Sequence, residues 1–236
     1  MKSIIYYTDN RLSGPIYDIA QKQLSNARLP VISASLESIH FGDNVVISGE
    51  RSYPTMVRQI ISCLERSKSK YVFFCEHDVL YHPSHFEFTP ERDDIFYYNA
   101  NSWRWLVGSE TLIRHDRMLS LSSLCANREF VLDHHKRRLK FIEENELEKE
   151  GGKEPRWARK MGYEPGTKKK KRGGFSDDDF EKWSSEFPII DIRHGKTFSS
   201  PKINLMDFIH KPKWWEEISA GSVPGWDLWR LFYERT

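Results

Sequence analysis

The sequence predicts an α/β protein, a single domain over residues 1–236 whose mixed, mostly parallel sheet is flanked by helices. Short apolar runs rich in β-branched and aromatic residues alternate with segments of helical period over the first 90 residues. The 236 residues, 39% of them hydrophobic, suffice for one complete core. The apolar run from Tyr71 to Cys75 is uninterrupted, which is typical of a parallel-sheet strand buried on both faces.

The first half of the chain has the clearest signals for individual elements. We expect strands at residues 3–7, 30–33, 44–48 and 71–75, and helices at 16–24 and 54–65. Both helices have apolar side chains at spacings of three and four, and each begins beside a proline, which is favoured in a first helical turn. This alternation implies parallel strands joined by helical crossovers.

The second half has fewer signals. We expect strands at residues 94–99 and 187–192, a helix from 118 to about 149, and a mobile basic loop at 151–174 within the domain. The loop carries nine Lys or Arg against two Glu, a net charge of +7, and it has no apolar period. Because the whole chain has a net charge of +2, the remainder carries about −5, so the positive charge is concentrated in this segment.

Cysteine use and hydropathy indicate where the protein works. Cys63, Cys75 and Cys125 are odd in number and lack metal-ligand spacing, which is typical of a reducing compartment and not of a disulfide framework. No apolar stretch approaches the roughly 20 residues of a transmembrane helix, and the apolar run at the start is too short for a signal peptide. We expect a cytoplasmic protein without membrane insertion.

The predicted strand at 71–75 runs directly into Glu76-His77-Asp78. Burying an unpaired carboxylate is costly, so we expect these side chains at the exposed carboxyl end of the strand. That end is where open α/β sheets bind ligands. Two acids separated by one residue can hold a divalent cation, which can in turn hold a diphosphate. The alternative is a strand end whose polar residues only cap a turn.

Three histidines, His77, His82 and His85, lie close together in this region. A zinc cluster is disfavoured, because no cysteine pair accompanies them and Pro83 interrupts any helical face that could align them. We expect residues 82–88 to form the bend after the strand.

Three short motifs carry a family resemblance that spans nearly the whole chain. Tyr7-Thr8-Asp9-Asn10 ends the first predicted strand, Glu76-His77-Asp78 ends a central one, and His194 follows a late one. In these motifs the chain resembles nucleotide-sugar-dependent glycosyltransferases of the Rossmann-like GT-A fold. The resemblance implies a hexosyltransferase that moves a sugar from a nucleotide sugar, with a UDP-sugar as the default donor, to an acceptor hydroxyl.

The same resemblance implies roles for the motif residues. Those expected to bind the donor are Thr8, Asp9, Asn10, Glu76 and His77. Asp78 and His194 would hold Mn²⁺ or Mg²⁺ against the diphosphate, which stabilises the charge that develops when the glycosyl–phosphate bond breaks. Glu76 stands where Asp is commoner in the family, so direct metal contact, contact through water and ribose binding all stay open. His210 is the competing late ligand.

Polar and aromatic side chains after the strand at 94–99 are candidates for the acceptor side. Amides, an indole face and a guanidinium suit a sugar or a flat base. They belong to Asn99, Asn101, Trp103 and Arg104. The alternative is a β-hairpin with ordinary cross-strand aromatic contacts.

An inverting enzyme also needs a carboxylate base near the acceptor hydroxyl. Enzymes of the resembled family often place it near the start of the helix after the acceptor loop. Asp116 and Glu129 are the candidates in that region, with Glu129 slightly preferred. Inversion and retention of the anomeric configuration both stay open.

The basic loop bears on the acceptor. With its Glu-His-Asp-Val-Leu-Tyr and Tyr-Asn-any-Asn-any-Trp-Arg stretches, the chain also resembles, less specifically, small bacteriophage glycosyltransferases. These modify 5-hydroxymethylpyrimidines such as 5-hydroxymethylcytosine in duplex DNA. The expected contacts to the DNA backbone are Lys168, Lys169, Lys170, Lys171 and Arg172. They would neutralise phosphates without reading sequence, and Trp157 and Tyr163 interleave with basic residues as in nucleic-acid-binding segments.

Three other interpretations of the loop stay open. It could be ordinary solvated surface. It could contact anionic lipid in an enzyme that builds a surface polysaccharide or a lipid-linked glycan. The third interpretation is a non-enzymatic nucleic-acid-binding protein, which the confinement of positive charge to one segment disfavours.

Overall fold

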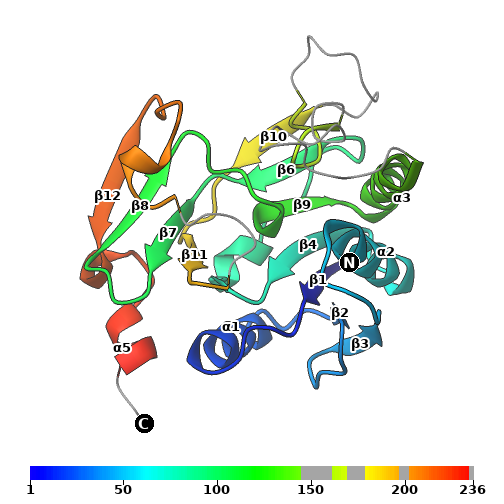
Figure 1. Ribbon diagram of the computed structural model, residues 1–236, viewed down its shortest axis with the longest axis horizontal. Coiled ribbons are helices and arrows are strands. Elements are labelled where there is room, and N and C mark those ends of the chain that lie inside the picture. Colours follow the sequence, from blue (N-terminus) through cyan, green and yellow to red (C-terminus); the bar gives the residue numbers. More distant parts are fainter. Residues whose placement is uncertain (145–160, 169–178, 197–201, 234–236) are drawn as a thin grey trace.

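The computed structural model describes residues 1–144, 161–168, 179–196 and 202–233. Its strands form two sheets that lie side by side, with helices packed against them (Figure 1). The first sheet has seven strands in the order β10-β6-β9-β4-β1-β2-β3. Their bounds are β1 (Lys2–Thr8), β2 (Val31–Ser35), β3 (Asp43–Val46), β4 (Tyr71–Glu76), β6 (Phe96–Asn99), β9 (Leu124–Asn127) and β10 (Phe180–Trp183). Parallel pairing of β1 with β2 and β4, of β2 with β3 and of β6 with β10 confirms the predicted mixed, mostly parallel α/β sheet.

The second sheet was not expected from the sequence. It has five strands in the order β12-β8-β7-β11-β5. Their bounds are β5 (Val79–Leu80), β7 (Ser102–Leu106), β8 (Thr111–His115), β11 (Ile189–Arg193) and β12 (Trp215–Ser219). The β7–β11 pair is parallel and the other pairs are antiparallel. Because most of these strands come from distant segments of the chain, no local pattern indicates which of them pair.

Helices pack on both faces of the first sheet. The described helices are α1 (Pro15–Ser25), α2 (Tyr53–Arg66), α3 (Arg128–Glu144) and α5 (Leu228–Tyr233), with 3-10 turns η1 (Pro83–Phe86), η2 (Leu121–Ser123), η4 (Leu205–Asp207) and η5 (Ala220–Ser222). On one face, Ile60 of α2 and Val131 of α3 share a core cluster with Phe74 of β4. On the other face, α1 contributes Leu24 to the first sheet's core and Ala20 to the second sheet's core, so it spans both.

Local chemistry accounts for the central elements. In β4, residues Val72 to Cys75 are fully buried, and burial of each large apolar side chain is worth about 2–3 kcal/mol. Helix α2 begins where the Ser52 hydroxyl accepts a hydrogen bond from the Thr55 amide at 3.2 Å, with Pro54 in the first turn. These two elements therefore form where the apolar pattern and the cap predict them.

The carboxyl ends of the parallel strands meet at one edge of the first sheet. Tyr7 of β1 lies opposite Glu76 of β4, and Thr8 lies opposite Ser35 of β2. The segments that follow these strands consequently lie close together, as expected for a binding edge.

The chain crosses from the first sheet to the second within two residues. His77 and Asp78 separate β4 from β5, and β5 pairs with β11 so that Val79 lies opposite Asp191. The Ile192 amide donates to the Asp78 carbonyl oxygen at 2.9 Å. This pairing brings the end of β11 beside the His77-Asp78 turn.

The helix expected from residue 118 begins only at Arg128. The turn η2 and the strand β9 precede it, and Cys125 of β9 lies opposite both Phe73 of β4 and Tyr97 of β6. Pairing on two sides in the centre of the sheet outweighs the helical spacing of this segment, so the prediction is wrong for residues 118–127. Residues 145–149 of the predicted helix lie outside the described part of the chain.

Residues 161–168 of the predicted mobile loop at 151–174 pack against the rest of the fold. Met161 is fully buried, Arg138 donates to the Tyr163 carbonyl at 2.9 Å, and the Tyr98 hydroxyl donates to the Pro165 carbonyl at 2.7 Å. These contacts fix the segment against α3 and β6. The other residues of the predicted loop lie outside the described part of the chain.

Candidate functional site

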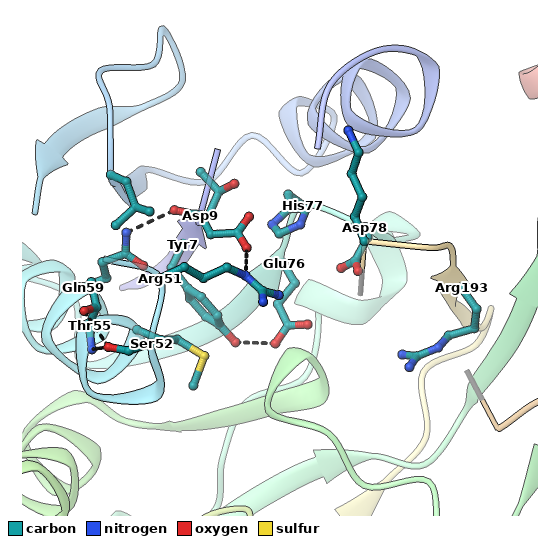
Figure 2. Close-up of a pocket in the computed structure, with 14 residues that line it drawn as sticks. Tyr7, Asp9, Arg51, Ser52, Thr55, Gln59, Glu76, His77, Asp78 and Arg193 are labelled. Atoms are coloured by element: carbon teal, nitrogen blue, oxygen red, sulfur yellow. Dashed lines mark hydrogen bonds and ion pairs between the residues drawn. The ribbon is translucent and has the colours of Figure 1, made fainter. Parts of the chain in front are cut away.

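A cleft opens at the edge where β1 and β4 end (Figure 2). It holds about 750 Å³ of empty space, part of it open to solvent, which is a typical size for a small-molecule site. Its walls come from the ends of β1 and β4, the start of α2 and the end of β11. The lining residues are Tyr7, Thr8, Asp9, Leu36, Arg51, Ser52, Thr55, Met56, Gln59, Glu76, His77, Asp78, Arg193 and Lys196.

Asp78 and His194 meet beside this cleft. Nε2 of His194 lies 3.2 Å from Oδ2 of Asp78. Burial opposes ionisation of Asp78, but the hydrogen bond from His194 and nearby positive charges outweigh it, so the pKa of this carboxyl lies below its ordinary value. One ligand atom each from His77, Asp78 and His194 lie within 4.8 Å of one another. His194 is therefore at the site, whereas His210 is exposed and does not belong to this group.

The other two histidines near β4 have structural positions. Nδ1 of His82 accepts from the Ser84 amide at 3.2 Å and so caps η1, which forms the bend expected after the strand. His85 is fully buried, and burial lowers its pKa to about 3. Neither ring belongs to the group around Asp78.

The Glu76 side chain points toward Tyr7 (Figure 2). The Tyr7 hydroxyl donates to Oε1 of Glu76 at 2.5 Å. Burial is the main cause that raises the pKa of Glu76 to about 8; the negative charge of Asp78 adds to the effect, and the hydrogen bond from Tyr7 opposes it. Glu76 lines the cleft but lies outside the His77, Asp78 and His194 group. Glu76, predicted as a possible metal ligand and as a donor contact, thus faces Tyr7 rather than this group.

The end of β1 supplies polar groups to the opposite wall of the cleft. Asp9 forms an ion pair with Arg51, just before α2 (Figure 2). The Thr8 carbonyl accepts from the side-chain amide of Gln59 at 3.0 Å. Asn10 is not among the residues that line the cleft; its side-chain oxygen accepts from backbone amides of the loop after β2 and holds that loop.

Arg193 brings positive charge to the cleft from the end of β11. Its Nη1 lies 3.1 and 3.3 Å from the two carboxylate oxygens of Asp191, which also accepts from Nε of Arg104 at 3.2 Å. The three side chains are at most 14% exposed. One carboxylate thus holds two guanidinium groups, and Arg193 is the one that lines the cleft. Arg104, predicted as an acceptor contact, is instead engaged by Asp191.

Sequence reasoning missed several residues of the cleft, among them Arg51, Arg193 and Lys196. Arg51 reaches the site from the start of α2, and its ion-pair partner is 42 positions away. For Arg193 and Lys196 a signal existed, since both flank the predicted ligand His194 just beyond a strand.

Glu164 is a further acid that the sequence did not point to. Its negative charge raises the pKa of both Tyr7 and Glu76, so its carboxyl lies close to the inner end of the cleft. Burial is the main cause that raises the pKa of Glu164 to about 7, against the charge of Arg138 and a hydrogen bond from the Leu121 backbone. Glu164 was not predicted as a cleft residue because its segment has the composition of a loop.

The predicted acceptor amides belong to an internal network. Asn99 is fully buried; its Nδ2 donates to Oγ of Ser185 at 2.8 Å and to Nδ1 of His85 at 3.0 Å. Its Oδ1 accepts from the Asn101 amide at 2.9 Å, and Nδ2 of Asn101 donates to the Ser185 carbonyl at 2.9 Å. Both amides hold the β6–β7 connection against the segment after β10, which contradicts their assignment as acceptor contacts.

Trp103 likewise packs inside the fold. It is 7% exposed and belongs to the core of the second sheet, with the Arg114 guanidinium 4.7 Å from its ring centroid. Ordinary packing of a cross-strand aromatic residue describes it better than an acceptor contact.

The two candidate bases lie away from the cleft. Glu129 is exposed and pairs with Arg128 at the start of α3, where Asn127 lies opposite Tyr71, the first residue of β4. Glu129 is thus at the opposite edge of the sheet from Asp78. Asp116 accepts from the Lys213 amide at 2.8 Å; it follows β8, which is antiparallel to β7, so it lies near the start of β11 and not near its end. These positions contradict both assignments.

The predicted DNA contacts are described only in part. Lys168 is 6% exposed, so it is not a surface contact for a phosphate. Lys169, Lys170, Lys171 and Arg172 lie outside the described residues. No helix in the described ranges is both long and apolar enough to cross a bilayer.

Comparison with known proteins gives similarity at the level of structure alone. No protein-family model matches the chain, and no curated protein matches it. A glycosyltransferase involved in glycosylation of the major capsid of PBCV-1 overlaps 62% of this chain and 69% of its own, with 8% identity and a TM-score of 0.39. The glycosyltransferase GlyE of Streptococcus pneumoniae TIGR4, in its apo form, overlaps 63% and 40%, with 9% identity and a TM-score of 0.38.

The bifunctional IspDF of Campylobacter jejuni overlaps 59% of this chain, with 13% identity and a TM-score of 0.35. The chain matches less than half the length of IspDF and of GlyE, 44% and 40% respectively. Scores of this size reflect a partial overlap of strands and helices, so what the protein does has to be inferred from its own side chains.

Proposed function

We propose that the protein is a metal-dependent glycosyltransferase that moves a hexose from a nucleotide sugar, with UDP as the expected nucleotide, to an acceptor hydroxyl. The observation that carries the proposal is Asp78, paired with His194, beside Arg193 and Lys196 at a cleft of nucleotide size. A carboxylate and imidazoles can hold a divalent cation, while guanidinium and ammonium groups bind phosphate oxygens. The combination suits the diphosphate of a sugar donor.

The proposed reaction explains why these groups belong together. The bond between the anomeric carbon and the phosphate oxygen breaks, and the electron pair stays on that oxygen. A bound divalent cation supplies positive charge to the diphosphate. Arg193 and Lys196 add positive charge from the same side, where the leaving group becomes more negative. The acceptor oxygen forms the new bond to the anomeric carbon, and its proton passes to solvent water.

The wall formed by β1 and α2 suits the nucleoside. Asp9 and Arg51 present a carboxylate and a guanidinium to the cleft, and both are partly exposed there. Such groups can bind ribose hydroxyls and the edge of a base, so a nucleoside would compete for the hydrogen bonds that they make to each other.

For the acceptor we propose a 5-hydroxymethylpyrimidine in duplex DNA. The support is the sequence resemblance and the basic run 169–172, which would bind phosphates by charge. Lys168 is buried and adds nothing to this support. A hydroxyl of a surface polysaccharide or a lipid-linked glycan is the alternative acceptor.

The test of the chemistry is metal-dependent UDP release from UDP-glucose and related donors. We expect Asp78→Asn to reduce release at least 100-fold without loss of fold. Asp133→Asn is the matched control, since Asp133 is an exposed carboxylate of α3 and should leave release unchanged. Equal release by wild type and Asp78→Asn would overturn the proposal.

The acceptor is tested in the same reaction with duplex DNA that contains 5-hydroxymethylcytosine or 5-hydroxymethyluracil. Mass spectrometry of the digested nucleosides should show a hexose-shifted product. UDP release without a DNA product, together with a product on oligosaccharide or lipid-linked acceptors, would contradict DNA as the acceptor. The same result would still support the proposed glycosyltransferase activity.

A further inference from the structure

Large apolar side chains are exposed together in the segment that leads into β12. Within residues 202–214, Ile209 is 97% exposed and Met206 is 85% exposed, and Leu205 and Trp214 are exposed as well. No other stretch of this length in the described ranges exposes as many large apolar side chains. The segment lies beside β8, on the side of the molecule away from α2 and α3 (Figure 1). Apolar groups exposed together mark surfaces that bind another protein or a membrane.

Specific contacts hold the 202–214 segment in place. The guanidinium of Arg117 donates to two of its backbone carbonyls, from Nη1 to His210 at 2.6 Å and from Nη2 to Lys211 at 3.1 Å. The Phe208 ring packs edge-on against the His115 ring, with 4.9 Å between the ring centroids. Because this ring faces the protein on an anchored backbone, the exposure of its apolar neighbours belongs to an ordered surface.

Positive charge accompanies these apolar side chains. The segment has three lysines and one aspartate, which gives a net charge of +2. Lys202, Lys211 and Lys213 are exposed, and none of them forms an ion pair with a described residue. The carboxylate of Asp207 is engaged within the segment, where its Oδ2 accepts from two backbone amides at 2.9 and 3.0 Å. The three ammonium groups are consequently available to an anionic partner.

We propose that the 202–214 segment binds the surface of an anionic lipid bilayer, with Met206 and Ile209 at the boundary of the acyl chains and the lysines on lipid phosphates. A bilayer surface offers an apolar boundary and a negative headgroup layer together, and tryptophan side chains such as Trp214 favour the same boundary.

Two other kinds of partner fit this surface less well. Duplex DNA offers phosphates, but it takes up apolar side chains only where its bases unstack. Lysine is depleted in protein–protein interfaces, whereas three lysines accompany the apolar side chains here. The proposal goes beyond the proposed sugar transfer and does not depend on it.

Binding at this surface leaves the cleft open. Arg193, which lines the cleft, lies opposite Leu106 at the ends of β11 and β7. Strand β8 runs antiparallel to β7, and its last residue, His115, lies opposite Trp215 at the start of β12. The 202–214 segment is therefore anchored at the end of the second sheet that is remote from the cleft. A molecule bound to a membrane in this way can still take up a small ligand.

The test is cosedimentation of the full chain with vesicles, without donor or metal. We expect binding to vesicles of phosphatidylcholine and phosphatidylglycerol in equal parts, and binding at least about tenfold weaker to phosphatidylcholine alone. The Met206→Ser/Ile209→Ser double variant should bind the anionic vesicles at least about tenfold more weakly than wild type. Val46→Ser is the matched control, because Val46 is an exposed apolar side chain of β3 and should leave binding unchanged.

A second pair of variants tests the charge. Lys211→Gln/Lys213→Gln should lose most of the preference for anionic vesicles and most of the dependence of binding on salt. Lys136→Gln/Lys140→Gln is the control, since it removes two exposed lysines of α3 and should keep both properties. Circular dichroism verifies that each variant is folded.

Three results would overturn the proposal. The first is a wild-type protein that does not bind anionic vesicles, or that binds them no better than Met206→Ser/Ile209→Ser does. The second is a dimer in analytical ultracentrifugation that depends on Met206 and Ile209 and forms in place of vesicle binding, which would indicate a second copy of the chain. The third is duplex DNA affinity that depends on Lys211 and Lys213 without vesicle binding. UDP release is measured separately, so failure of either proposal leaves the other standing.

Discussion

The Tyr7 hydroxyl donates to the Glu76 carboxylate at 2.5 Å, across the two central strands that carry the cleft. Tyr7→Phe removes this donor and leaves a buried carboxyl with one partner fewer. We expect the free energy of unfolding to fall by about 1–3 kcal/mol, measured by urea denaturation, while Mn²⁺ affinity stays within threefold.

A second Tyr→Phe substitution, at an exposed tyrosine, serves as the control for the loss of a hydroxyl group in itself. The Tyr71 hydroxyl meets Asp93 at 3.0 Å on the surface, so Tyr71→Phe should change stability by less than about 0.5 kcal/mol. A tenfold change of Mn²⁺ affinity in Tyr7→Phe would indicate that Glu76 takes part in metal binding after all.

Asp191→Asn tests the charge cluster at the end of β11. Arg104 and Arg193 share this carboxylate, and all three groups are largely buried. Removal of the shared charge should lower the free energy of unfolding by about 3–5 kcal/mol. Asp43→Asn, at an exposed ion pair with Arg66, should leave the free energy of unfolding nearly unchanged. Similar losses of unfolding free energy in Asp191→Asn and Asp43→Asn would show that the buried cluster stabilises the fold no more than an exposed ion pair does.

Asn99→Ala distinguishes an internal amide from an acceptor ligand. Its side chain bonds Ser185, His85 and the Asn101 amide inside the protein, so we expect a loss of at least about 2 kcal/mol in urea denaturation. Asn101→Ala removes the side-chain hydrogen bond to the Ser185 carbonyl and should cost about 1 kcal/mol. If Asn99→Ala were as stable as wild type but had a raised KM for acceptor, the result would support the prediction from sequence that Asn99 contacts the acceptor.

The raised pKa of Glu164 predicts that the stability of the protein depends on pH. Its pKa in the folded protein is about 7, against an ordinary value of 4.5. The folded state therefore holds this proton more tightly than the unfolded state, and the free energy of unfolding falls as pH rises from 4.5 to 7. The loss is at most about 3 kcal/mol.

The Glu164→Gln variant has no ionisable group at this position, so this contribution to the fall in unfolding free energy with pH should be absent. Urea midpoints at pH 5 and pH 8 should show the variant gaining on wild type at the higher pH. A difference between the two proteins that does not change with pH would contradict the enclosed position of this carboxyl.

The sequence predicted the elements whose signals are local. The run Tyr71 to Cys75 is a buried strand because it is apolar throughout, and α2 begins at a cap that is visible in the sequence. The closeness of Asp78 and His194 was predicted for a related reason, since both follow apolar strands, and strand ends in such sheets meet at one edge.

The parts that were missed depend on partners far along the chain. Strand β9 is short and looks helical, and it becomes a strand because β4 and β6 lie on its two sides. Asn99 has the chemistry of a sugar ligand, and only its distance to Ser185 reveals that it is satisfied internally. Glu129 has a suitable position in sequence, but β9 runs antiparallel to β4 and carries it to the opposite edge.

The passage from β4 to β5 through His77 and Asp78 has a mechanical consequence. His77 directly follows β4 of the first sheet, whereas the Asp78 carbonyl is hydrogen-bonded to β11 and His194 extends β11, so rotation of the two sheets against each other would change the separation of His77 from Asp78 and His194. An ion held between them therefore opposes such rotation, and any substrate that favours one relative orientation of the sheets must change metal affinity by the same factor. Hydrogen exchange in β5 and β11 with and without Mn²⁺ would measure this linkage.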